Sequence, residues 1–220
     1  MSRLKGIGLP IEVKEIEIPW FQVPGFRDPR KGDVIVFIWP GYRDEAKAKD
    51  FQYYLKRCVA VSHDTIRIVN KTVYINGAPF DNPSGVLYTP EVIPANMADP
   101  SIFPAGMPWN RDNYGPLVVP GKGDVIELTT ENINLWFTFM RREGHQVDMQ
   151  GETILVDGKP AKTYTVQRDY VFGMGDNRDD SLDSRFWGFI PKEHVIGTPI
   201  IVYMSLKGGI RFHRLGTIIR

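Results

Sequence analysis

Most of this chain alternates short apolar runs with turn residues, a pattern typical of β structure. The run DVIVFIWP at 33–40 has strand length and many β-branched residues, and Gly32 and Pro40 bound it. Runs at 65–69 and 72–75 lie two residues apart and predict a hairpin through Asn70-Lys71. The pattern predicts further strands at 53–61, 122–128, 153–156, 161–166, 169–174 and 197–206, with 153–156 and 161–166 joined as a hairpin through Asp157-Gly158. The predicted fold class is mainly β.

Two segments depart from this pattern. TENINLWFTFMRREG at 130–144 predicts one helix, with Thr130 as its N-cap. Arg141 and Arg142 suit the last turn, and Gly144 suits the end of the helix. Residues 78–119 are rich in Pro, Asn, Gly and Asp, and prolines this frequent disfavour both helix and central strand. We expect an ordered, loop-rich excursion there.

The order of these segments predicts the domain organisation. Strands come first, then a section of different character, then strands again. The simplest arrangement is a discontinuous β core formed by residues 1–77 and 164–220, which carries residues 78–163 as an inserted subdomain. Strands from both ends of the chain would then pair in one sheet.

Composition and charge exclude several classes of function. The chain has 220 residues, of which 42% are hydrophobic, enough for a substantial core. Its 27 Lys and Arg nearly balance its 26 Asp and Glu, so we expect no nucleic-acid partner. The single cysteine, Cys58, excludes an internal disulfide, and the four scattered histidines lack metal-ligand spacing. We therefore expect no metal and no cofactor. No run approaches the roughly 18 apolar residues of a membrane span, and Met1 opens no signal-peptide pattern.

The densest chemistry lies in GMGDNRDDSLDSRFWGFIP at 173–191. Four aspartates and two arginines surround Ser181 and Ser184, and apolar residues flank them on both sides. A solvated loop would explain the charges. It would not explain the apolar flanks, which would bury the ends of the loop, and buried charges must pair. A calcium loop would need a ligand where Arg178 stands and a glycine that is absent. Two further possibilities stay open: a purely structural ion-pair turn, and a rigid frame that positions one serine hydroxyl beside a reacting residue.

The same stretch carries a family resemblance. GDNRDDSLDSRFWGFIP resembles the motif G-D-N-R-D-x-S-x-D-S-R-x-x-G-x-[VI]-P of bacterial type I signal peptidases at every fixed position. KGDVIVFIWP and LKRCVAVSHD resemble two more blocks of that family in the same order, and the tail YMSLKGGIRFHRLGTII resembles its closing strand. The likeness covers nearly the whole chain and is loose only in the middle. It implies a signal-peptidase-like antiparallel β-sheet catalytic domain.

The resemblance also implies a chemistry, that of a serine endopeptidase with a Ser–Lys dyad that removes N-terminal signal peptides from secreted proteins. Lys56 matches the general base of the family, and Ser181 matches the serine that orients the lysine amine. Such a lysine must be partly neutral near pH 7, and burial lowers its pKa from an ordinary value of about 10.4. The supporting positions are Arg57, Asp176, Asp183 and Arg185, and the expected apolar cover is Tyr53, Tyr54, Leu55, Cys58 and Val59.

The match fails where the family has its nucleophile. That serine belongs to a Ser-Met-x-Pro block just after a transmembrane helix, and this sequence has neither. Ser2 is the only serine before Lys56 and lacks the Met-x-Pro context, so it is a weak candidate. GIGLPIEV at 6–13 resembles the stretch just downstream of the missing block. We interpret the sequence as N-terminally truncated, or begun too late, and expect it to be inactive as given. A smaller departure is Ser62-His63, where the family has Pro-Gly before Asp64.

The resemblance implies partners and a location. The substrates would be signal peptides of exported preproteins, and the catalytic domain would lie on the outer, periplasmic face of the cytoplasmic membrane. The apolar stretch IPWFQVPGF at 18–26 is the candidate for contact with the membrane surface. A substrate peptide would add to a sheet edge, with DVIVFIW and RCVAV as candidate walls. The alternative is a non-catalytic relative that binds peptides or secretion partners. A Ser–Lys self-cleaving repressor is disfavoured, because that class lacks the long charged motif.

Overall fold

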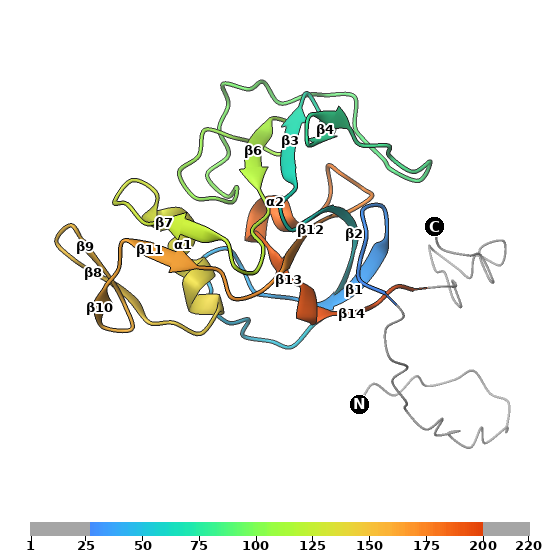
Figure 1. Ribbon diagram of the computed structural model, residues 1–220. Helices are drawn as coiled ribbons and strands as arrows, with labels where there is room; N and C mark the ends of the chain where they lie inside the picture. The colour runs from blue at the N-terminus through green and yellow to red at the C-terminus, as the bar shows by residue number, and fades with distance from the viewer. Residues whose placement is uncertain (1–26, 200–220) are drawn as a thin grey trace, which may run out of the picture.

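A five-stranded antiparallel sheet forms the centre of the molecule, with strand order β13-β12-β2-β1-β14. The computed structural model describes residues 27–199 (Figure 1). The strands of this sheet are β1 (Val34–Ile38), β2 (Tyr53–Val61), β12 (Tyr170–Met174), β13 (Ile190–Pro191) and β14 (Val195–Gly197). β2 pairs with β1 along one side and with β12 along the other. Early and late strands therefore share one sheet, as expected, whereas the domain boundaries themselves stay a prediction.

A second sheet has the strand order β5-β4-β3-β6. Its strands are β3 (Thr65–Val69), β4 (Thr72–Ile75), β5 (Ala78–Pro79) and β6 (Tyr114–Val118). The β3–β4 hairpin is confirmed, and Asn70 and Lys71 both have the positive φ that its turn requires, 45° and 70°. β6 lies inside the segment expected to be loop. Its Pro116 is tolerated there because β6 is an edge strand, which needs no further N–H donor.

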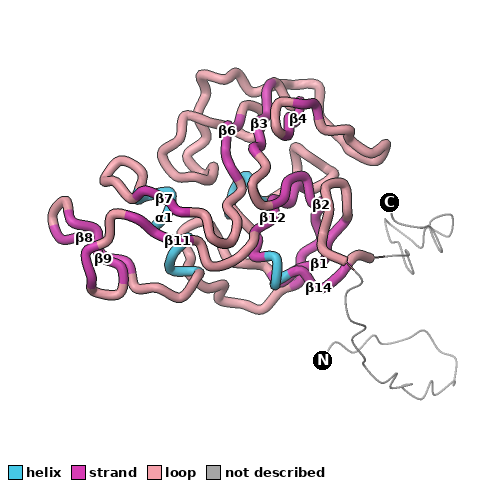
Figure 2. Tube along the Cα trace, viewed as in Figure 1, coloured by secondary structure: helices cyan, strands magenta, loops and turns pink. Residues whose placement is uncertain are grey.

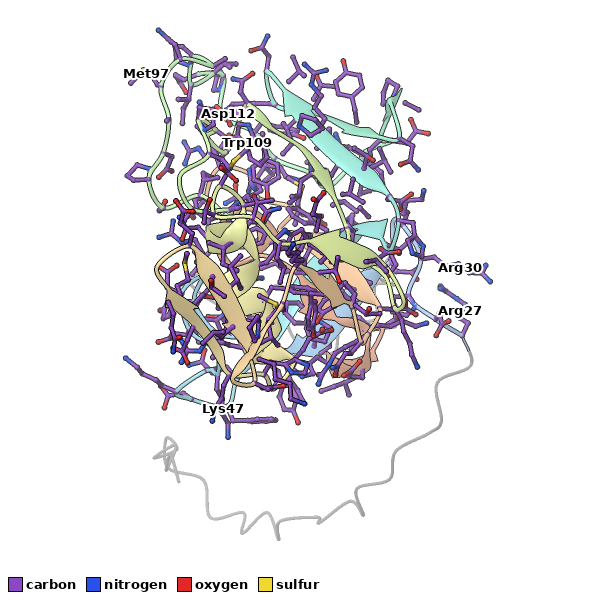
Figure 3. The ribbon with its side chains drawn as sticks, turned by 60° about the vertical axis from the view of Figure 1, so that its left-hand side comes forward. Arg27, Arg30, Lys47, Met97, Trp109 and Asp112 are labelled. Carbon is purple, nitrogen blue, oxygen red and sulfur yellow. The ribbon has the colours of Figure 1, made fainter. Side chains whose placement is uncertain are left out.

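The long excursion between β5 and β6 has little regular structure, as predicted. The tube of Figure 2 is drawn as loop over most of this segment, and one isolated bridge joins Leu87 to Asn177. Aromatic packing helps to hold it, since the rings of Trp109 and Tyr114 lie 5.0 Å apart. Figure 3 shows Met97 and Trp109 at one end of the molecule and Lys47 at the other. The excursion is therefore an ordered cap at one end of the molecule.

The remaining strands differ from the prediction in one pairing. They are β7 (Val125–Glu127), β8 (Val147–Gln150), β9 (Thr153–Val156), β10 (Lys159–Pro160) and β11 (Thr163–Thr165). β9 turns at Asp157-Gly158 into β10, as a hairpin should, but β11 pairs with β7 instead of continuing along β9. The prediction that 161–166 completes this hairpin was wrong. The physical reason is Tyr164, which is buried and donates its hydroxyl to Glu143, drawing β11 away from β9.

The predicted helix is present as α1 (Ile133–Arg142), but Thr130 is not its N-cap. The Asn132 side chain accepts instead from the Thr129 N–H at 2.9 Å, and the helix begins one residue later. Its last turn holds Arg141 and Arg142 as expected. Two short helical segments were not predicted, α2 (Ser184–Trp187) and η1 (Lys192–His194). Within residues 27–199 no helix is both long and apolar enough to cross a membrane.

Candidate active site

Lys56 and Ser181 lie 125 residues apart in the sequence and meet in the structure. Lys56 comes from the middle of β2, and Ser181 from the loop that follows β12. The Lys56 Nζ donates a hydrogen bond to Ser181 Oγ at 2.9 Å. Gly175 makes this approach possible, because a Cβ there would lie 2.2 Å from Ser181 Oγ. The structure thus brings together the two residues that the resemblance assigns as the general base and the serine that orients it.

The apolar cover of Lys56 comes from two aromatic rings. Its Nζ lies 6.0 Å from the ring centre of Tyr54 and 5.7 Å from that of Trp187. The expectation that Tyr53 and Leu55 would help was wrong, since they are 56% and 54% exposed. Successive strand residues point to opposite faces, so these two leave the face that Lys56 occupies. Trp187 was missed because only the three-dimensional fold places α2 over β2.

The burial of Lys56 has an electrostatic consequence. Desolvation lowers the pKa of the Lys56 amine below its ordinary value, and nearby Arg185 lowers it further, while Asp183 acts in the opposite direction. Because the pKa is lowered, the neutral amine becomes populated at a lower pH than for an exposed lysine. A neutral amine can accept a proton, which an ammonium group cannot do.

Asp183 and Arg185 form a buried pair behind Ser181, with exposed fractions of 0% and 2%. Arg185 Nε donates to Asp183 Oδ1 at 2.9 Å, and Arg185 Nη2 donates to Oδ2 at 2.8 Å. The carboxylate also accepts from the Gly175 N–H and from the Ser181 side chain. Burial raises the pKa of Asp183, but Arg185 and these donors hold it below its ordinary value. Ser181 therefore connects Lys56 to a buried carboxylate.

A second ion pair fixes the same loop to β2 from the opposite face. Arg57 Nε and Nη2 donate to the two oxygens of Asp176 at 2.8 and 2.7 Å. The bidentate geometry is the strongest form of such a pair. Of the six residues named from the resemblance, Lys56, Ser181, Asp183 and Arg185 are joined by successive contacts, and Arg57 and Asp176 form a separate pair on the opposite face of β2.

The inserted excursion also contacts the charged loop, which the sequence did not reveal. Leu87 donates its N–H to the Asp176 carbonyl, and the Thr89 N–H donates to Asp179 Oδ2. Ser184 Oγ accepts from the Gly173 N–H at 3.0 Å, which suits a structural hydroxyl.

In the described part of the chain, no three His, Cys, Asp or Glu side chains are grouped as metal ligands would be. Three aspartates of the loop are instead paired with arginine or lysine side chains: Asp176 with Arg57, Asp179 with Lys71 and Asp183 with Arg185.

The replacement of Pro-Gly by Ser62-His63 is accommodated just beyond β2. His63 takes a positive φ of 71°, which a glycine would adopt more easily. The Asp64 carboxylate closes the turn by accepting from the Val61 N–H at 3.0 Å. The β2 ladder with β1 runs through Lys56 without a shift in register. Three features of the sequence analysis lie outside the described residues: Ser2, the apolar stretch 18–26 and most of the predicted strand 197–206.

Comparison with known proteins places this geometry in a family. The family described as "Signal peptidase, peptidase S26" matches residues 14–204. "Signal peptidase I" of Helicobacter pylori is 28% identical over 217 residues, which are 91% of this chain and 66% of that protein. "Signal peptidase I" of Aquifex aeolicus is 27% identical over 186 residues, which are 82% of this chain and 65% of that protein. The chain thus spans slightly less than two thirds of the length of these relatives.

A signal peptidase I from Enterococcus faecalis, known from its crystal structure, aligns with 79% of this chain and 97% of its own, at 17% identity and a TM-score of 0.34. The match of the family over residues 14–204 carries the assignment. The chain belongs to the signal peptidase S26 family.

Proposed function

We propose that this chain carries the catalytic base of a signal peptidase that removes N-terminal signal peptides from exported preproteins. The observation that supports this most directly is the hydrogen bond of 2.9 Å between Lys56 Nζ and Ser181 Oγ, made beside two aromatic rings. A lysine held in this way is suited to general base catalysis, since its pKa is lowered by burial. The proposed reaction is hydrolysis of a peptide bond through a serine acyl-enzyme.

In the proposed mechanism, the neutral Lys56 amine takes the proton from the hydroxyl of a nucleophilic serine as that oxygen attacks the scissile carbonyl. The resulting ammonium gives the proton to the departing amine, and the acyl-enzyme forms. The amine then removes a proton from water as the water oxygen attacks the ester, and the ammonium passes that proton to the departing serine oxygen, which frees the serine and restores the neutral amine. Ser181 acts as a positioning residue, because its oxygen can accept from Lys56 while its hydroxyl donates to Asp183.

We propose that the nucleophile comes from a segment outside the described residues. Among residues 27–199, Ser181 is the hydroxyl that bonds Lys56, and it is already engaged by Asp183. A second serine on the other side of the amine would complete the dyad. The family pattern places such a serine upstream, next to a membrane anchor, so the domain would act at the outer face of the cytoplasmic membrane.

The substrate peptide would bind along β2, next to Lys56. The ladder between β2 and β12 ends at Arg57, so within the described residues 53–56 pair with β1 alone. An extended peptide could hydrogen-bond to this open edge. Of the expected walls, RCVAV is unsuitable, because Cys58, Val59 and Ala60 are fully buried. The exposed side chains of Tyr53 and Leu55 are the better candidates for contact with the peptide.

The test is to replace Lys56 in a chain extended upstream with a membrane anchor and the family serine block. We expect the extended chain to cut a signal-peptide substrate, and Lys56→Met to lower the rate roughly 10²–10⁴-fold while the fold is kept. The 220-residue chain should leave the substrate uncut. Lys49→Met is the matched control, since that side chain is 86% exposed and should not affect cleavage.

Substantial cleavage by the Lys56→Met variant would remove Lys56 from the role of base. The alternative function is peptide binding without cleavage. If the extended chain binds a signal peptide but never cuts it, that alternative holds.

A further inference from the structure

Arg142, at the end of α1, makes an unusual set of contacts. Its guanidinium donates to four backbone carbonyls that come from two segments distant in sequence. Nη1 donates to the Trp187 carbonyl at 2.9 Å, and Nε donates to the Glu45 carbonyl at 3.0 Å. Nη2 donates to the carbonyls of Tyr42 at 2.6 Å and of Gly41 at 3.3 Å. One side chain of the inserted section thus joins α2 to the loop after β1.

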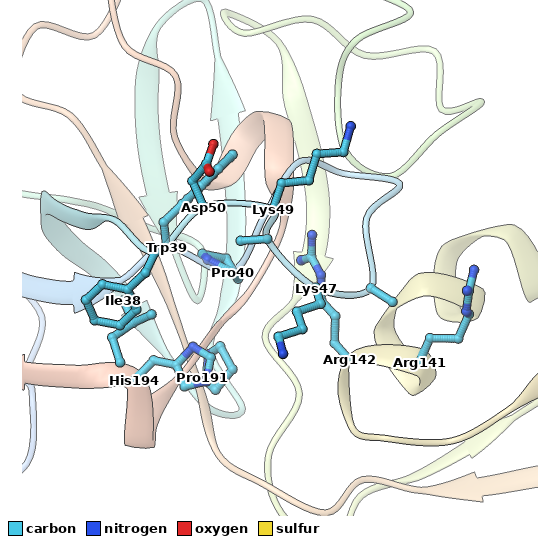
Figure 4. A pocket seen from close by; sticks show the side chains of 13 residues that line it. Ile38, Trp39, Pro40, Lys47, Lys49, Asp50, Arg141, Arg142, Pro191 and His194 are labelled. Atoms are coloured by element: carbon cyan, nitrogen blue, oxygen red, sulfur yellow. The ribbon is translucent and has the colours of Figure 1, made fainter.

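This guanidinium is deeply placed for a charged group. Burial lowers the pKa of Arg142 to about 10, while Tyr170, Glu45 and Asp44 act against that shift. Its hydrogen-bond partners are neutral carbonyls. In Figure 4, Arg142 extends from α1 toward the loop that carries Lys47, beside a cavity of about 550 Å³, and Arg141 leaves the helix in another direction. Arginine suits this position because its planar guanidinium carries five N–H donors in a fixed arrangement, which a lysine amine could not supply.

The helix joined by Arg142 carries Trp187, one of the two rings beside Lys56, and the other ring, Tyr54 of β2, packs against Trp187 and against Trp39 of the loop. Trp39 stacks on Tyr54 with ring centres 5.4 Å apart and meets Tyr42 edge-on at 4.7 Å. Trp187 contacts Tyr54 at 5.5 Å between ring centres. We call this group the aromatic cluster, and its members are Phe37, Trp39, Tyr42, Tyr54 and Trp187.

The Trp187 ring has no polar anchor of its own. Its indole N–H is buried and makes no hydrogen bond within the described residues. The ring position therefore depends on packing and on how the main chain of α2 is held. α2 has only four residues, so its internal hydrogen bonds supply little rigidity. The bond from Arg142 to the Trp187 carbonyl is the direct tie between α1 and this residue.

We propose that Arg142 is a positioning residue for the catalytic base, holding Trp187 and the loop at 41–45 so that the aromatic cluster stays closed over Lys56. The proposal rests on the proposed function of Lys56. It assigns to α1 a role in the reaction although no residue of α1 hydrogen-bonds Lys56 or Ser181. Loosening this tie would admit water beside the amine and favour the ammonium form.

The experiment is an NMR titration of the Lys56 amine in the 220-residue chain, with ¹³C-labelled lysine and Lys56→Met for assignment. We expect Arg142→Met and Arg142→Lys each to raise the pKa of Lys56, by roughly one unit for the former and less for the latter. The charged groups that face Lys56, Asp183 and Arg185, are unchanged in both variants. Arg141→Met is the matched control on the same helix and should leave the pKa at the wild-type value.

Arg142→Lys separates positioning from charge. A purely electrostatic influence would move the pKa in Arg142→Met alone, and that result would overturn the proposal. Trp187→Leu should raise the pKa by itself, and Arg142→Lys should add nothing in that background.

Two further results would overturn the proposal: a wild-type Lys56 pKa in folded Arg142 variants, or failure of both variants to fold, which would assign Arg142 to global stability. An ordinary lysine pKa in the wild-type chain would instead count against the proposed base. The two failures are therefore distinguishable.

Discussion

Among the residues of the site, Asp183 has a special need for hydrogen-bond donors, because it carries a negative charge inside the protein. Its carboxylate is fully buried and accepts from Arg185, Gly175 and Ser181 at once. A buried ion pair contributes little net stability compared with apolar residues of the same size, but breaking it leaves a charge without compensation. We therefore propose that the pair serves chiefly to hold Ser181 in place.

Asp183→Asn should lower the free energy of unfolding by roughly 3–5 kcal/mol, because Arg185 would keep its charge in a buried site without a counter-ion. Urea denaturation of the 220-residue chain measures this. Asp180→Asn is the matched control, since Asp180 lies in the same loop and is exposed. Equal stability of the two variants would contradict the importance of the pair.

The lowered pKa of Asp183 also predicts a dependence of stability on pH. A carboxyl whose folded-state pKa lies below the unfolded value of about 3.9 contributes stability above that value. The contribution is lost as pH falls through the folded-state pKa. We therefore expect the titration of Asp183 to cause no change in the urea midpoint between about pH 5 and 7. Below about pH 4 the midpoint should decrease as the pH falls. The fall should be shallower in Asp183→Asn, and an equally steep fall would contradict the assignment.

At the scale of elements, local pattern was sufficient where a strand is defined by its own side chains. β2 has the predicted bounds, and the hairpin through Asn70-Lys71 is present. Prediction failed where a partner from elsewhere decides. The position of β11 depends on the hydrogen bond from the Tyr164 hydroxyl to Glu143. The short helix α2 depends on Asp183, whose buried side chain caps its first turn. The helix start was missed because Asn132 bonds back to Thr129.

The end of α2 offers a test of how tightly this element is held. Gly188 has a φ of 94°, and a Cβ there would lie 2.9 Å from the Phe103 ring. Gly123 has nearly the same φ, 93°, with open space around it. We expect Gly123→Ala to cost about 1 kcal/mol of backbone strain and Gly188→Ala to cost about 1–3 kcal/mol more, from overpacking. Urea denaturation compares them, and equal losses would show that the contact with Phe103 yields easily.

At the scale of the whole molecule, the site depends on parts that are far apart in sequence. β2 supplies Lys56, the loop after β12 supplies Ser181, α1 bonds the Trp187 carbonyl, and the excursion before β6 bonds the charged loop at Asp176 (Figure 1). The pairing of Lys56 with Ser181 was anticipated from the family resemblance. Local sequence pattern alone could not have predicted it, because the two positions lie 125 residues apart. The contacts of Arg142 and Leu87 could not be anticipated, because both residues lie in the inserted section, which resembles the family only loosely.

Hydrogen exchange should reveal this organisation. We expect the amides of β12 and of residues 57–61 of β2 to exchange slowest, because these segments pair inside the central sheet and most of their residues are buried. The hairpin of β8, β9 and β10 should exchange faster, as its sheet has three short strands and many exposed residues. Mass spectrometry of exchanged peptides measures both, and uniform protection would contradict the expected difference.

The ladder of β2 with β12 stops one residue short of the base. A strand edge that lacks a partner strand accepts almost any extended chain, including a second copy of the same protein. Backbone pairing alone therefore cannot tell a correct substrate from a wrong one. If the proposed function holds, the exposed side chains of Tyr53 and Leu55 would supply the discrimination, and a change at these two positions would alter the choice of cleavage site without altering the contact between Lys56 and Ser181.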